Sequence, residues 1–194
     1  MRAVMVAALG LALIAPAGAS ANGFVEDVRV LQEWHGTPGG NFGWAVSELQ
    51  DIDHDGVTDV IVGEPSAGRT WVFSGRTGRT LHRFDGAAGF SIADAGDTAR
   101  DGVHDVISGT TTRALLYSGR TGDLLHTFTG AGYGYSVSSA GDLNLDGFDD
   151  VAIGATSAGV VDIYSGRTYG LLRRLQGDRF GSGLDTSPAS RPPS

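Results

Sequence analysis

Residues 51–59 read DIDHDGVTD, with aspartate at the first, third, fifth and ninth positions and glycine at the sixth. The pattern returns, with one change, as DTARDGVHD at 97–105, and as DLNLDGFDD at 142–150. The spacing is about 45 residues, and self-similarity at such a period is typical of repeat architectures. The sequence therefore predicts three copies of one structural unit.

Each acidic loop has the same neighbours on both sides. Nine residues before the first aspartate stands a glycine-centred opening, which reads Phe42-Gly43-Trp44, Ala88-Gly89-Phe90 or Tyr133-Gly134-Tyr135. After the loop come an apolar run ending in glycine, a second apolar run, a Ser-Gly-Arg-Thr turn and a closing alternating run. Four short apolar runs separated by turns indicate strands, and four strands per repeat of this length are typical of a propeller blade.

The predicted fold class is all-β, with β-propeller-type blades: three complete four-stranded blades plus partial terminal blades. The complete repeats cover residues 42–86, 88–130 and 133–177. Partial units are expected at 28–36, which resembles a closing strand, and at 180–184, which resembles an opening one. Together they form one propeller region over 22–187. The openings' aromatic residues are expected to pack between neighbouring blades.

The two chain ends differ from the repeats. Residues 1–21 combine Arg2, an apolar stretch and the triplet Ala19-Ser20-Ala21, which indicates a secretory signal peptide. The apolar run is shorter than the roughly 20 residues that span a membrane. We therefore expect no membrane span after cleavage, and a secreted, extracellular or cell-surface protein, with the periplasm as an alternative. The proline-rich tail 188–194 is predicted to be disordered.

Composition limits the chemistry of the chain. It has 31 glycines and no cysteine, so any metal must be held by oxygen or imidazole ligands. The formal net charge of −8 offers no basic surface for neutralising phosphates, so nucleic acid is not an expected partner. No nucleophile-elbow, zinc-protease or P-loop motif is present in the sequence, so we expect no catalytic activity of its own.

The spacing of the first and third loops predicts calcium sites. Calcium takes six to eight oxygen ligands, and a glycine after the third acidic position lets the chain double back around the ion. The proposed ligands in the first loop are the side chains of Asp51, Asp53, Asp55 and Asp59 and the carbonyl of Val57. Those in the third loop are Asp142, Asn144, Asp146, Asp150 and the carbonyl of Phe148.

The second loop is expected to bind calcium weakly or not at all. It keeps Asp97, Asp101 and Asp105 but has Ala99 at the third position, with Arg100 beside it. None of the three loops is an EF-hand, because that motif needs a glutamate at the twelfth position. In the first and third loops this position is held by Val62 and Ile153.

These combined motifs resemble the FG-GAP repeat of the integrin alpha-subunit propeller and of many secreted bacterial proteins. The FG part of the family name matches Phe42-Gly43 and Tyr133-Gly134. The GAP part matches Gly63-Glu64-Pro65 and Gly154-Ala155-Thr156. The resemblance implies four-stranded blades with calcium between a blade's first and second strands. Relatives form seven-bladed rings, which three blades cannot complete.

The function that follows is a secreted, calcium-binding recognition or adhesion module with a protein or glycan ligand. Two alternatives stay open: a lectin-like carbohydrate-binding propeller, and a truncated fragment of a larger FG-GAP surface protein or enzyme. Because the terminal blades are incomplete, we expect self-association through them, or a marginal, aggregation-prone fold.

Overall fold

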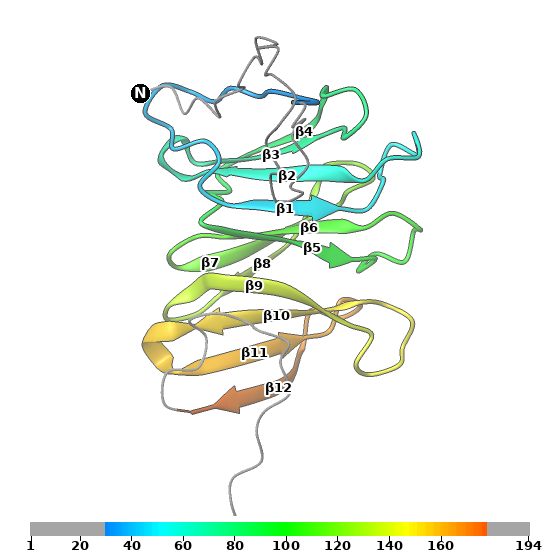
Figure 1. Ribbon diagram of the computed structural model, residues 1–194. Helices are drawn as coiled ribbons and strands as arrows, with labels where there is room; N and C mark the ends of the chain where they lie inside the picture. The colour runs from blue at the N-terminus through cyan, green and yellow to red at the C-terminus, as the bar shows by residue number, and fades with distance from the viewer. Residues whose placement is uncertain (1–29, 178–194) are drawn as a thin grey trace, which may run out of the picture.

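A computed structural model describes residues 30–177, and its strands form three four-stranded antiparallel sheets (Figure 1). Within each sheet the strands pair in sequence order, so every sheet is one blade. Blade 1 contains β1 (Val46–Leu49), β2 (Asp59–Glu64), β3 (Arg69–Phe73) and β4 (Thr80–Asp85). Blade 2 contains β5 (Ser91–Gly96), β6 (Asp105–Gly109), β7 (Arg113–Tyr117) and β8 (Leu124–Thr129). Blade 3 contains β9 (Tyr133–Gly141), β10 (Asp150–Ala155), β11 (Val160–Tyr164) and β12 (Leu171–Gln176).

The fold class predicted from the repeats is confirmed. Each second strand is rich in valine and isoleucine and lies between two neighbours, and β6 and β10 are buried along their whole length. Branched side chains of this kind fit the pleated surface of a sheet. The only helical turns among residues 30–177 are η1 (Pro65–Ala67) and η2 (Thr156–Ala158), each ended by a glycine in the left-handed conformation.

The hydrophobic core lies between the blades rather than within any one of them. One cluster joins blades 1 and 2 and includes Ile61, Val72 and Leu115. A second cluster joins blades 2 and 3 and includes Leu116 and Ile153. A single sheet cannot bury its own apolar face, so each blade depends on the next one for its stability.

Two glycine motifs of the repeat meet at these interfaces. A Cβ atom on Gly63, the penultimate residue of β2, would lie 2.1 Å from the carbonyl oxygen of Gly89 in blade 2. A Cβ on Gly109 would lie 2.0 Å from the carbonyl oxygen of Gly134 in blade 3. The glycine of one blade's opening therefore packs backbone to backbone against the run-ending glycine of the preceding blade.

The interpretation of the opening aromatics as interblade packing fits Tyr133, which is buried in the cluster that joins blades 2 and 3, and Trp44, which meets Phe90 of blade 2 edge-on. Phe42 packs edge-on against Phe73 within its own blade. Trp44 and Tyr135 are nevertheless each 61% exposed. The intervening glycines have φ of +84° and +86°, and this turn of the backbone separates the two side chains.

Residues 30–37 form no strand, yet they pack as a closing strand would. Trp34 stacks on Phe73 with ring centroids 5.0 Å apart. The corresponding pairs between complete blades are Phe84 with Tyr117 at 4.2 Å, and Phe128 with Tyr164 at 4.8 Å. Between residues 30 and 37 the segment therefore places an aromatic side chain where a complete blade does, without forming the strand expected at 28–36.

Four sequence predictions lie wholly or partly outside the described residues. They are the signal peptide at 1–21, the start of the partial unit at 28–36, the partial unit at 180–184 and the tail at 188–194. Between residues 30 and 177, no helix has the length and apolar character needed to cross a membrane.

Candidate metal centre

All three acidic loops connect the first and second strands of a blade and adopt one backbone shape. The fourth position is in the left-handed region in every copy, followed two residues later by a glycine with φ between +84° and +88°. The fourth-position residues are His54, Arg100 and Leu145. Because the second loop turns in the same way without a carboxylate at its third position, this side chain is not needed for the loop's shape.

The first aspartate of each loop closes the turn. In the first loop, Asp51 accepts hydrogen bonds from the backbone N–H groups of Asp55 at 3.0 Å and Gly56 at 2.7 Å. Partial desolvation raises its pKa, but these hydrogen bonds outweigh that effect and the pKa of Asp51 is lowered.

The ninth aspartate is buried and ties the loop to the Ser-Gly-Arg-Thr turn. Asp59 accepts hydrogen bonds from the N–H groups of Ile52 at 2.9 Å and Gly75 at 3.1 Å. Asp150 makes the same two bonds with Leu143 and Gly166. Desolvation raises the pKa of both carboxyl groups, although the hydrogen bonds act against it. The sequence pattern indicated a ligand here but not this second, structural role.

The first loop brings three predicted ligands together. Single carboxylate oxygens of Asp51, Asp53 and Asp59 all lie within 4.8 Å of one another. Two oxygens that bind one calcium ion at about 2.4 Å can be separated by at most about 4.8 Å. The donor set therefore fits a calcium ion in both chemistry and spacing. Asp55 lies elsewhere: one oxygen accepts from Ser74, and the other is 3.4 Å from Arg76.

The third loop repeats the backbone hydrogen bonds of the first. Asp146 donates its N–H to Asp142 and to Asn144, both at 2.9 Å, as Asp55 does to Asp51 and Asp53. The seventh position, whose carbonyl was predicted as a ligand, holds Val57 in the first loop and Phe148 here. The ring of Phe148 is contacted by two guanidinium groups, those of Arg100 at 5.6 Å and Arg167 at 5.5 Å from its centroid.

In the second loop, the carboxylate at the ninth position makes different hydrogen bonds. One oxygen of Asp105 accepts hydrogen bonds from both the Thr98 hydroxyl at 2.5 Å and the Ala99 N–H at 3.0 Å. Burial raises the pKa of Asp105 to about 6 despite these bonds. Asp101, at the fifth position, is paired with Arg120 at 3.1 Å. With Ala99 at the third position, this loop has one oxygen-bearing side chain fewer than either of the others.

Two further buried carboxylates lie outside the loops, and the sequence reasoning missed both. Glu64 accepts hydrogen bonds from the Trp71 indole at 2.8 Å and from the N–H of Thr37, so it anchors the N-terminal segment to blade 1. Asp162 is bound by both Nε and Nη2 of Arg174 at 2.6 Å, which lowers its pKa. An acidic residue inside an otherwise apolar strand was the only sequence signal for either.

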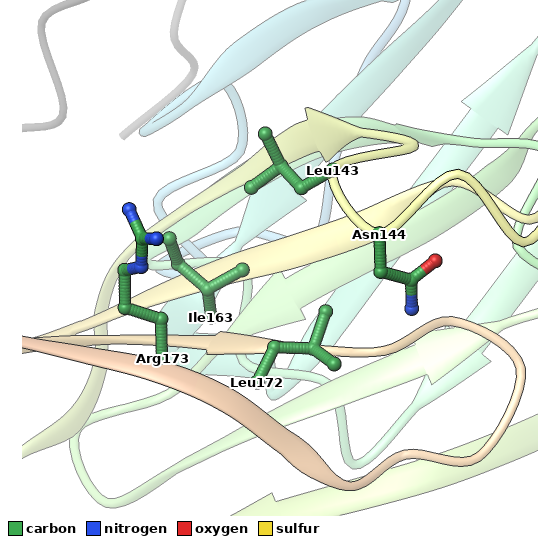
Figure 2. A pocket seen from close by; sticks show the side chains of 5 residues that line it. All are labelled: Leu143, Asn144, Ile163, Leu172 and Arg173. Carbon is green, nitrogen blue, oxygen red and sulfur yellow. The ribbon is translucent and has the colours of Figure 1, made fainter.

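A hollow of about 270 Å³ lies beside the third loop (Figure 2). Leu143 and Asn144 of the loop line it together with Ile163 of β11 and Leu172 and Arg173 of β12. By register, Ile163 corresponds to Val72 and Leu116, which are fully buried by the following blade. The hollow is therefore part of the face that the other two blades cover with a neighbour.

The fold and loops define a propeller-type module with an acidic turn after the first strand of each blade. Comparison with known families agrees: the FG-GAP repeat matches residues 42–79 and 133–170, which begin at the openings of blades 1 and 3. These two segments of the chain are therefore FG-GAP repeats.

Among solved structures, the chain is similar to one described as "Crystal structure of BBS1N in complex with ARL6DN, soaked with lead". The two are 19% identical in sequence, with a TM-score of 0.48. The match covers 68% of this chain and 37% of that one, so this chain spans little more than a third of the length of that structure.

Proposed function

We propose that the protein is a secreted, calcium-binding FG-GAP module for recognition or adhesion, with no catalytic activity of its own. The observation that carries the calcium proposal is the convergence of Asp51, Asp53 and Asp59 in the loop between β1 and β2. FG-GAP repeats are typical of extracellular or surface proteins, which supports a location where calcium is abundant.

In the first loop the ion would be held by Asp51, Asp53, Asp55 and Asp59 with the carbonyl of Val57. In the third loop the corresponding groups are those of Asp142, Asn144, Asp146, Asp150 and Phe148. A bound calcium ion would supply positive charge to a cluster of carboxylates. The protein's own residues set the geometry, because the first and ninth aspartates hold the loop backbone through their N–H bonds.

The test is calorimetric titration of residues 22–194 with calcium, comparing wild type with Asp53→Ala. The second loop carries alanine at this position and keeps the same turn, so the substitution removes a ligand while leaving the loop folded. We expect two sites in the wild type and one in the variant. Chelator should lower the melting temperature, because bound calcium stabilises the folded state. When free calcium is 100 times the Kd of a site, that site adds about 2.7 kcal/mol to the free energy of unfolding.

The matched control is Ala99→Gly, which changes the second loop without removing a ligand and should keep both sites. A titration without heat, together with a melting temperature that is unaffected by chelator, would contradict the proposal.

Carbohydrate binding is a second candidate, favoured by the exposed residues of the blade openings. Trp44, Phe90 and Tyr135 occupy one position in the three repeats, and Trp44 contacts Phe90 edge-on at 6.1 Å. Exposed aromatic side chains of this kind are typical of binding surfaces. A glycan-array signal lost in Trp44→Ala but kept in Asp53→Ala would support this candidate.

We also propose that the protein self-associates through its terminal blades. Every residue of β12 is exposed, including Leu171, Leu172 and Leu175, which are 40–50% exposed. This strand forms one edge of blade 3 and has no partner on its outer side among residues 30–177. Such an edge beside exposed leucines favours association between chains.

A further inference from the structure

The arginine of each Ser-Gly-Arg-Thr turn reaches the acidic loop of its own blade, but its partner differs between blades. In blade 1, Arg76 Nε lies 3.4 Å from a carboxylate oxygen of Asp55. In blade 2, Arg120 Nε lies 3.1 Å from Asp101, which is the equivalent aspartate. In blade 3, the guanidinium of Arg167 lies over the ring of Phe148 instead.

The seventh loop position differs between the blades in the same way. It holds valine in the first two loops and phenylalanine in the third. An aromatic face attracts a guanidinium group, so Phe148 offers Arg167 an alternative to the fifth aspartate. That aspartate, Asp146, instead accepts a hydrogen bond of 3.1 Å from the side-chain amide of Asn144, a neutral donor.

We propose that Arg76 is a built-in competitor of calcium at the first loop, and that Phe148 keeps Arg167 from playing the same part at the third. This inference rests on the proposed calcium function and concerns the regulation of that site. A cation that binds Asp55 competes with Arg76 for this carboxylate and binds beside a positive charge.

The competition is set by exposed charges and is therefore modest. The Arg76 side chain is 55% exposed, so solvent and salt screen its charge. A unit charge about 6 Å from a divalent ion in a medium close to water still changes affinity by roughly three- to ten-fold. The same argument adds to the missing ligand in the second loop, where Arg120 also donates to the backbone carbonyl of Asp101.

The experiment measures calcium Kd by calorimetry at the first loop, in a background of Asn144→Ala that disables the third. Arg76→Gln should bind calcium about three to ten times more tightly than the background protein, and the gain should shrink as salt is raised. The matched control is Arg167→Gln, measured at the third loop in an Asp53→Ala background, where the Kd should change by less than about two-fold.

A second variant tests the cause. Val57→Phe places the third loop's aromatic residue in the first loop, so Arg76 should leave Asp55 for the new ring and the first loop should again bind more tightly. Unchanged Kd in both Arg76→Gln and Val57→Phe would overturn the inference while leaving calcium binding intact. Absence of calcium heat in every variant would overturn the inference and the proposed function together.

Discussion

At the scale of single residues, the ninth aspartate of each loop is subject to two opposing requirements, charge and burial. It must be charged to bind a cation, yet it lies buried beneath the loop, with Asp105 and Asp150 fully inaccessible to solvent. Two or three hydrogen-bond donors compensate each carboxylate, and still its pKa is raised in all three blades because desolvation is the largest influence. These groups therefore weaken the metal-free fold when they ionise.

The pH dependence of stability follows from Asp105, whose pKa rises from 3.8 to about 6 on folding. The folded state binds the proton more tightly, so the stabilisation is complete below pH 3.8 and is lost as pH rises through 6. In chelator, this group alone should lower the free energy of unfolding by about 1.4 kcal/mol between pH 5 and 7.5. Urea unfolding of the wild type and of Asp105→Asn at both pH values measures this change in the free energy of unfolding.

The pH slope should be shallower in the Asp105→Asn variant. Asp85→Asn is the control, because the ion pairs of Asp85 with Arg83 and Arg69 lower its pKa and give it no part in this pH range. An identical slope in wild type and Asp105→Asn would show that Asp105 is already ionised at pH 5 in the folded protein.

At the scale of elements, the blade interfaces depend on the absence of side chains as much as on apolar contacts. Near the end of β2 and at the end of β6, Gly63 and Gly109 lie against the backbone of the next blade's opening. Any Cβ there would force two main chains apart, and neither can yield as a flexible side chain could. This explains why both glycine motifs occur in one repeat although many residues separate them.

Gly63→Ala should therefore destabilise the protein by about 2–4 kcal/mol, because its Cβ would overlap the carbonyl of Gly89. The comparison is Gly102→Ala in the second loop, where a Cβ meets nothing within 4 Å and only the strain of φ +84° remains. That variant should cost about 1 kcal/mol. Chemical denaturation measures both, and equal losses would rule out the backbone contact as the cause.

At the scale of the whole molecule, the three blades stack one on another, and the described residues cover the outer face of blade 1 only (Figure 1). Residues 30–37 cover blade 1 through Trp34, whose indole donates to the carbonyl of Gly78 at 2.9 Å. On blade 3, the hollow beside Leu172 and the edge of β12 have no such cover among residues 30–177. Association of chains is expected at this end.

Leu172→Glu should reduce self-association, because it places a charge in the exposed apolar face that a second molecule would bury. Leu124→Glu is the matched control, since Leu124 is also about half exposed but lies on β8 of blade 2. Light scattering over a concentration series measures the mass of each. A wild-type chain that stays monomeric, with a high melting temperature, would contradict the expectation.

The sequence by itself determined the blades and the position of the acidic loops. Strand formation, glycine turns and first-aspartate hydrogen bonds involve neighbours within a few residues, so a period of about 45 residues carries them in every copy. Asp51 and Asp53 were predicted as ligands for this reason, and the structure brings them together with Asp59.

Only the tertiary structure decided how the repeats differ in their long-range contacts. The partner of Asp55 comes from the hairpin after β3, the burial of Asp59 depends on that same turn, and the exposure of Trp44 depends on blade 2. A repeat pattern specifies what each unit shares. The seventh loop position is Val57 in the first loop and Phe148 in the third, and the arginine of the neighbouring turn has a different partner in each. The spacing of residues along the chain does not predict that contact.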